Sequence, residues 1–121
     1  MQDNGKVILR FRDGRTERAT VAVIDAASEV LNATHDDGAA ERIPFTDLKA
    51  VFFPRIVPEE QLEPAHGSLI AVEFADGEVI RGTASYNPEA SGFFLFPLDR
   101  SKNERIFVVR AAIASIEVEK L

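Results

Sequence analysis

The sequence of 121 residues contains no cysteine. A disulfide framework, a thiolate metal site and a cysteine nucleophile are therefore all excluded. No apolar run approaches the roughly 18 residues that a membrane-spanning helix needs, and residues 1–10 lack the basic and apolar regions of a signal peptide. We therefore expect a cytoplasmic protein that makes no membrane contact.

Groups suited to catalysis are also scarce. The two histidines, His35 and His66, have no ligand partner at helical or strand spacing. The His-Asp-Asp segment at 35–37 could touch a cation weakly, but a polar turn explains it better. No serine lies in a nucleophile elbow, no glycine-rich phosphate loop is present, and the paired acids lie in expected loops. We therefore predict no enzyme activity, no cofactor and no metal site.

Positive charge is in short supply, since the formal net charge is −6. Binding to nucleic-acid phosphate depends on Lys and Arg displacing counterions, so this balance opposes it in general. Residues 6–18 are locally basic, although ordinary solvated strand faces explain them better than a binding patch. If the chain binds nucleic acid or a nucleotide instead of protein, the candidate phosphate contacts are Arg10, Arg12, Arg15, Arg18 and Arg110.

The sequence does contain an internal repeat. The segment "FRDGRTERATV" at 11–21 matches "FADGEVIRGTA" at 74–84 in its Phe, Asp-Gly, Arg and Thr, and residues 41–53 resemble residues 104–118 across a two-residue gap. Such similarity indicates a tandem duplication. We therefore expect three parts: a first small β-barrel repeat (1–54), a linker rich in Pro and Glu (55–66), and a second small β-barrel repeat (67–121).

Each repeat has the pattern of short antiparallel strands. Alternating apolar residues lead into Asp13-Gly14 and Asp76-Gly77, and such a pair is a strong hairpin signal because Gly accepts the positive φ of a primed turn. Later strands are expected at 20–24 and 83–86, 29–34 and 92–98, 42–45 and 105–109, and 51–53 and 115–118. A helical turn precedes each last strand, and the linker can hold another at 59–62. This order predicts an all-β fold of two tandem five-stranded SH3-like or Sm-like barrels.

The stretch "GFFLFP" at 92–97 is apolar without alternation. A continuous apolar run is typical of a strand that is buried on both faces. We therefore expect this strand to pass through the middle of a bent sheet, with the other repeat covering one face and residues 99–104 forming a polar hairpin loop. The alternative is an exposed patch at Phe94 and Phe96 that is available to a partner.

Spacings in the second repeat resemble those of Sm-like proteins. Gly77 and Gly82 are spaced as in the first Sm motif, and residues 108–118 are similar to the second motif, with Arg110 at its arginine. The RNA-contacting Asn of the family is replaced, and the first repeat has Asp47 where the arginine would lie. The resemblance implies the barrel fold and does not extend to the RNA site.

Longer segments carry a second resemblance: Leu48 to Phe53, Phe74 to Glu78, Tyr86, Gly92 to Asp99 and Asn103 to Val109. They are similar to the recurring words of an uncharacterised bacterial family of tandem small-barrel domains, over nearly the whole chain. That family implies no established activity. PilZ domains, which bind cyclic dinucleotides, are a further alternative, but the arginines of residues 15–18 are one residue too close and residues 87–92 place Ser and Gly side by side.

We therefore expect a non-catalytic binding or adaptor module that acts in bacterial regulation through protein–protein contacts. In this hypothesis the polar loop after residue 98 and the turn at Tyr86 form a rim around an aromatic anchor for a protein partner. The candidate interaction residues are Tyr86, Asn87, Asp99, Asn103 and Arg105. The alternative is nucleic-acid or nucleotide binding by an Sm-like or PilZ-like barrel.

Overall fold

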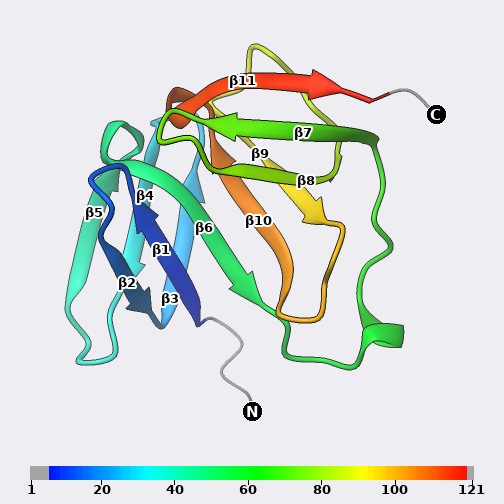
Figure 1. The fold of residues 1–121 in the computed structure, drawn as a ribbon. Helices are drawn as coiled ribbons and strands as arrows, with labels where there is room; N and C mark the ends of the chain where they lie inside the picture. The colour runs from blue at the N-terminus through cyan, green and yellow to red at the C-terminus, as the bar shows by residue number, and fades with distance from the viewer. Residues whose placement is uncertain (1–5, 120–121) are drawn as a thin grey trace.

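The computed structural model describes residues 6–119, which form mostly β-strands (Figure 1). The first half contains β1 (Val7–Phe11), β2 (Thr16–Ala19), β3 (Val21–Asp25), β4 (Val30–Thr34), β5 (Ala40–Pro44), the 3₁₀ turn η1 (Phe45–Asp47) and β6 (Leu48–Pro54). After η2 (Glu59–Gln61), the second half contains β7 (Ser68–Phe74), β8 (Val79–Ala84), β9 (Gly92–Pro97), β10 (Asn103–Val109), η3 (Arg110–Ala112) and β11 (Ile113–Val118). The predicted all-β class and the three short helical turns are confirmed.

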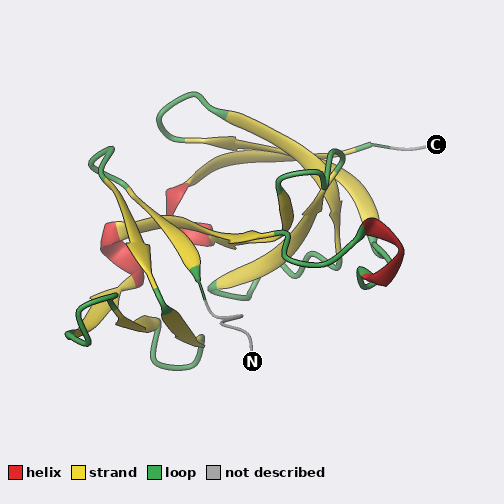
Figure 2. Ribbon diagram, turned by 90° about the horizontal axis from the view of Figure 1, so that it is seen from below, coloured by secondary structure: helices red, strands yellow, loops and turns green. Residues whose placement is uncertain are grey.

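The strands form two antiparallel sheets. The larger has the order β11-β7-β8-β9-β10-β6-β1-β2, and the smaller has the order β3-β4-β5. Neither sheet closes into a barrel, so the described residues do not form two separate closed barrels. One edge of β10 pairs with β9, and the other edge pairs with β6 of the first half instead of with β11. Strands of both halves therefore belong to one sheet (Figures 1 and 2).

The two halves pair their strands in the same register. Val7 lies opposite Ala19 in β1–β2, and Ile70 lies opposite Gly82 in β7–β8, so each partner shifts by 63 positions (70 − 7 and 82 − 19). The last strand of each half, β6 or β11, pairs with β1 or β7. In both cases its second residue is left out of the pairing. A β-bulge therefore occurs at the same place in both halves.

The Asp-Gly turns of the two halves also agree. Gly14 and Gly77 have φ values of +97° and +95°, as predicted. Their amides donate to the carbonyls of Phe11 and Phe74 at 3.1 and 2.9 Å. Each loop therefore has three residues, a type I turn followed by Gly in the left-handed region, and not the two residues of a primed turn.

The second strand, expected to continue through 20–24, is divided into β2 and β3 because the chain bends at Thr20. The Thr20 amide donates to the carbonyl of Thr34 at 2.7 Å, and its hydroxyl donates to Asp36 at 2.6 Å. Before this residue the chain forms β2, an edge strand of the larger sheet. After it the chain forms β3, an edge strand of the smaller sheet. One residue therefore carries the chain from one sheet to the other.

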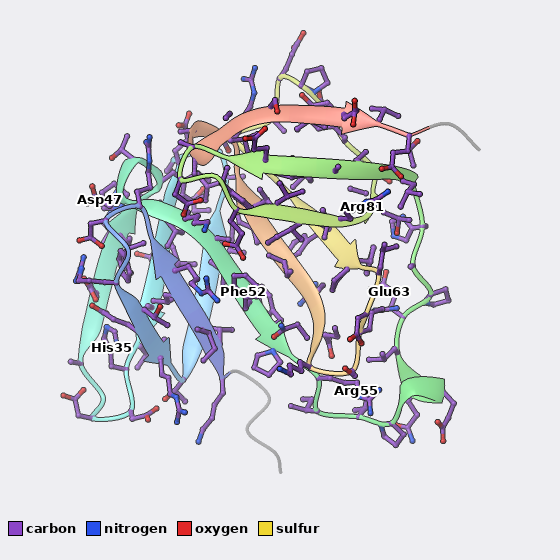
Figure 3. The ribbon with its side chains drawn as sticks, viewed as in Figure 1. His35, Asp47, Phe52, Arg55, Glu63 and Arg81 are labelled. Carbon is purple, nitrogen blue, oxygen red and sulfur yellow. The ribbon has the colours of Figure 1, made fainter. Side chains whose placement is uncertain are left out.

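Strands β6 and β10 lie between two hydrophobic cores. Successive side chains of a strand point to opposite faces, and in these strands both sets are apolar. Phe107 and Val109 of β10 complete the first core, which is otherwise built by the first half. Ala50 and Phe52 of β6 complete the second core, which is otherwise built by the second half. Figure 3 labels Phe52 between the two groups of strands.

Strand β9 is buried on both faces, as the apolar run predicted. Phe93 and Leu95 belong to the second core, whereas Phe94 packs on the first core with its ring centroid 5.2 Å from that of Phe107. Phe96 is only 5% exposed. The alternative, an exposed patch at Phe94 and Phe96, is therefore wrong for Phe96.

We predict that neither residues 1–60 nor residues 61–121 fold alone. Each fragment would lack the β-strand that completes its core, and a domain of about 60 residues buries only about 60% of its unfolded surface in any case. Circular dichroism and NMR of the fragments, separately and mixed, test this. Two well-folded fragments that do not associate would contradict it.

We also predict that Gly77→Val lowers the free energy of unfolding by at least about 1 kcal/mol, because a β-branched residue is strained at positive φ. No atom lies within 4 Å of a Cβ added there, so the cost comes from backbone conformation and not from crowding. Gly77→Asn should cost less, since Asn tolerates this region. Urea unfolding measures both, and an unchanged Gly77→Val protein would show that the turn is misassigned.

Candidate site at the free edge of β11

A large cavity lies beside β11. Its volume is about 630 Å³, and it is lined by β11, η3, the 85–91 loop and two residues of the first half, Glu29 and Phe45. We call it the β11 groove. The 85–91 loop rises behind β11 in Figure 1. Both halves of the chain therefore build this groove, and its lining combines apolar and charged side chains.

Tyr86 forms part of the groove wall. Its ring meets Phe93 of the second core edge-on, with centroids 5.3 Å apart and planes at 66°. The side chain is half-buried and lines the groove. A tyrosine held in this way presents a rigid ring and a hydroxyl that tolerates water, which suits contact with another molecule.

Hydrogen bonds hold the 85–91 loop against η3 and the first half. The Arg110 amide donates to the Ser91 carbonyl at 2.9 Å, and the Ser91 hydroxyl donates to the Ala26 carbonyl at 3.1 Å. The Asn87 side chain accepts a hydrogen bond from the Glu89 amide at 3.0 Å, which closes the loop from within. The loop that forms one wall of the groove is therefore held by the fold itself.

The groove follows an edge of β11 that no described strand occupies. Among the described strands β11 pairs with β7 alone, whereas β6, the matching strand of the first half, pairs with β1 on one edge and with β10 on the other. The β10–β6 ladder runs antiparallel from Asn103–Pro54 to Val108–Ala50. An unpaired edge offers amide and carbonyl groups to a further strand. The β11 groove therefore lies along the edge of β11 that matches the β10-bound edge of β6.

Arg110 occupies the place in the second half that Phe45 occupies in the first. Each begins the helical turn before the last strand, and each amide donates at 2.9 Å to the residue that precedes the third strand, Ser91 or Glu29. The sequence comparison matched Arg110 with Asp47, which is wrong by two residues. The extra residues of the second half lie in the β9–β10 hairpin, before the turn.

The outer face of β11 is polar where the matching face of β6 is apolar. When the pairing of β11 with β7 is aligned with the pairing of β6 with β1, Ser115 corresponds to Ala50 and Glu117 corresponds to Phe52. Ala50 and Phe52 are buried in the second core, whereas Ser115 and Glu117 are exposed. Burying a carboxylate without a partner is costly, so this face suits water or a polar partner.

The structure does not bring the predicted interaction residues together. Tyr86 and Asn87 precede β9 and lie at or beside the groove, whereas Asp99, Asn103 and Arg105 follow β9 in the β9–β10 hairpin. The two loops lie at opposite ends of β9 (Figure 1). Tyr86 therefore belongs to the candidate site, and the hairpin residues form a separate surface.

Contacts within the fold account for Arg105 and Asp99. The Arg105 guanidinium lies between the rings of Phe53 and Phe94, 4.6 and 4.5 Å from their centroids. The Asp99 carboxylate accepts a hydrogen bond from the Ser101 amide at 2.9 Å, which lowers the pKa of Asp99. These contacts hold the hairpin in one shape.

Of the four arginines within residues 10–18, Arg10 and Arg15 are ion-paired. Their ion pairs are Arg10–Glu78 at 3.7 Å, Arg15–Asp13 at 2.9 Å and Arg15–Glu17 at 2.8 Å. Arg12 donates to the Thr46 carbonyl at 3.4 Å, Arg18 is exposed on β2, and Arg110 lies apart, in the groove. Within residues 6–119 these arginines do not form the row of unpaired cations that phosphate binding requires.

Lys49 links the two halves. Its only signal in the sequence is a single charge inside an otherwise apolar strand. Its side chain is 7% exposed, and its ammonium donates to Asp76 at 2.7 Å and to Glu78. Burial, the largest influence, lowers the pKa of Lys49, but the hydrogen bonds to the two carboxylates outweigh it and raise the pKa. A charged Lys49 therefore ties the bulge of β6 to the turn at Gly77.

Glu17, His35 and Glu41 offer potential metal-ligand atoms within 4.8 Å of one another. His35 Nε2 lies 2.7 Å from Glu41, however, and Nδ1 lies 3.2 Å from the carbonyl of Arg18, so both ring nitrogens are engaged. A metal ion would have to break these hydrogen bonds. The cluster is better explained as a link between β2 and β5, beside the predicted polar turn at 35–37.

Ser85, His66 and Glu63 are aligned as a nucleophile, base and acid would be. Ser85 Oγ lies 3.4 Å from His66 Nδ1, and His66 Nε2 lies 3.7 Å from Glu63. Both distances are long for hydrogen bonds, and the side chains of His66 and Glu63 are 58% and 62% exposed. The arrangement therefore does not activate Ser85 as a nucleophile.

We predict that His35 makes stability depend on pH. The hydrogen bond to Glu41, and next that to the Arg18 carbonyl, raise the pKa of His35 above its ordinary value of 6.5. This stabilisation is complete below pH 6.5 and is lost as the pH rises through the folded-state pKa. The urea midpoint should therefore fall between about pH 6 and pH 8, and fall less in Glu41→Gln. Identical pH dependence in Glu41→Gln and wild type would contradict this.

Comparisons with known proteins place the chain in one family. None of the helical turns among residues 6–119 is long and apolar enough to cross a membrane. No curated protein and no solved structure matches the sequence. A family model does match residues 3–120, and its description is a family of unknown function. The predicted membership of an uncharacterised family is therefore confirmed: the chain belongs to the family of unknown function DUF6982.

Proposed function

We propose that the protein is a non-catalytic protein-binding module, made of two duplicated small-barrel units of the SH3-like or Sm-like kind, that binds an extended segment of a partner along β11. The equal registers of the two halves support the duplication. In both halves the last strand lies beside the first, as β6 beside β1 and β11 beside β7. This order supports the relation to small barrels.

One observation carries the proposal: the chain already holds a strand at one of its two matching edges. Strand β10 is bound antiparallel along β6, and the matching edge of β11 is followed by a groove. When an extended segment adds to a sheet edge, main-chain hydrogen bonds supply affinity and side-chain pockets supply specificity. The β11 groove offers both, because an unpaired backbone edge lies beside a pocket with an aromatic wall.

The size of the groove agrees with this role. The groove measures about 630 Å³, which is large enough for several side chains of a bound strand and also lies in the range of about 300–1,000 Å³ of small-molecule pockets. Tyr86 and Arg110 both line it, and tyrosine and arginine are enriched among the residues that dominate protein interfaces. The groove is therefore suited to a protein segment.

Three exposed aspartates are unsuited to act as general acids. Hydrogen bonds from the Arg15 amide, the Lys49 ammonium and the Ser101 amide lower the pKa values of Asp13, Asp76 and Asp99 respectively. A general acid at neutral pH needs the opposite shift. The ion pairs of Arg10 and Arg15 favour a protein partner over a phosphate.

Hydrogen exchange tests the proposal on a complex of the intact chain with a partner captured from the native cell. We expect the amides of residues 113–118 to exchange more slowly in the complex, because a bound strand protects an edge. The amides of residues 40–43, on the open edge of β5, should not change. Protection elsewhere, with none in residues 113–118, would overturn strand addition at β11.

Tyr86→Ala should weaken capture of that partner about tenfold, as loss of an interface aromatic does, and by more than the loss of its packing on Phe93 explains through stability. Val79→Ala is the matched control, because Val79 is an apolar residue 55% exposed on β8 that does not line the groove. Loss of capture in proportion to loss of stability would return Tyr86 to a purely structural role.

A further inference from the structure

The β11 groove differs in chemistry from the filled edge of β6, and this difference describes what it binds. We infer that the groove takes an antiparallel extended segment in which a basic side chain lies opposite Glu117 and the next side chain is aromatic and enters the cavity beside Tyr86 and Arg110. This inference rests on the proposed function, because it names the chemistry of the bound segment.

The bound strand β10 provides the register. On β6, Ile106 lies opposite Phe52, and Phe107 lies opposite Val51. Glu117 is the residue of β11 that matches Phe52. A segment that binds β11 in the same register therefore has one residue opposite Glu117, at the position that Ile106 has on β6. Its next residue corresponds to Phe107 and enters the groove.

The residue opposite Glu117 should be Lys or Arg. An apolar side chain there would cover an exposed carboxylate without pairing it, whereas opposite charges on facing strands stabilise each other. The same face also carries Glu73, which is exposed and lies opposite Ser115, and Arg81, which is ion-paired with Glu119. The negative charge of this face therefore selects a basic residue.

The next residue should be aromatic. Phe107 packs against Phe45 with ring centroids 5.7 Å apart, and Arg110 takes the place of Phe45 in the second half. An aromatic ring in the groove would meet the Arg110 guanidinium and the ring of Tyr86, and both contacts are favourable. An acidic side chain would also attract Arg110, but the two glutamates that line the groove would repel it.

A second copy of the chain that binds through its open strand β5 does not fit these requirements. Strand β5 corresponds to β10, because Ile43 faces Leu31 of β4 as Val108 faces Phe93 of β9. In the same register, a β5 strand would place Glu41 opposite the carboxylate of β11, and like charges facing each other are destabilising.

The following residues of β5 oppose self-pairing as well. Arg42 would meet Arg110, and Pro44 has no amide hydrogen to donate to a ladder. Charged residues and proline on edge strands are common barriers to unwanted strand pairing. The inference therefore commits to a segment of another protein.

The chain itself provides the probe. A labelled peptide of residues 103–110, the segment that binds β6, is prepared with Ile106 kept or replaced by Lys or Glu. Against the intact protein, we expect the Lys peptide to bind about fivefold more tightly than the Ile peptide, and the Glu peptide to bind most weakly. Adding Phe107→Ala to the Lys peptide should weaken binding about tenfold. Fluorescence anisotropy measures the dissociation constants.

Charge reversal is the decisive step. The Glu117→Lys protein should prefer the Glu peptide over the Lys peptide, and its melting temperature should hold because Glu117 is exposed. Glu60→Lys, an exposed change on η2, is the matched control and should keep the original preference. An unreversed preference would overturn the inference, and so would failure of every peptide to bind.

Hydrogen exchange keeps the two proposals distinguishable. Slower exchange of residues 113–118 with the Lys peptide locates binding at β11 and supports the inference. If the captured partner protects these amides but the peptides show no charge preference, the chemistry inferred for the segment is wrong and strand addition stands. If the partner leaves these amides unprotected, the proposed function itself is wrong.

Discussion

The pairing of β6 with β10 is the constraint on which the rest of the structure depends. Both strands are apolar on both faces, since Phe107 fills the first core and Phe52 fills the second. Each half of the chain therefore lends a strand face to the core of the other half. Chains of about 60 residues bury too little surface to be stable alone, and this exchange of strand faces gives each half a complete core.

The same pairing makes the two halves unequal. Joining the last strand of one half to the fourth strand of the other occupies one edge of each half and leaves β11 and β5 open. Apolar residues at the joined edge allow permanent burial. The open edge has Arg110 and Glu117 at the places of Phe45 and Phe52, and such polar edges suit reversible contact with a chosen partner.

Charge supports the joined edge from outside the cores. Lys49 lies at the bulge of β6 and bonds to Asp76 and Glu78 in the first hairpin of the second half. A buried ammonium needs such partners, because an unpaired charge in a protein interior is strongly destabilising. The bulge directs the Lys49 side chain toward these carboxylates and thus helps to hold the two halves in register.

The sequence alone determined the all-β class, the Asp-Gly turns with their positive φ and the two-sided burial of β9, because local periodicity and glycine conformation govern these features. It also singled out Tyr86. It could not show that β10 completes the ladder of β6, that Tyr86 and Asp99 lie at opposite ends of β9, or that Arg110 matches Phe45. Strand pairing between distant segments depends on which edges meet, and the length of the β9–β10 hairpin sets the register there. Only the tertiary structure decides these, and with them the place of the open groove.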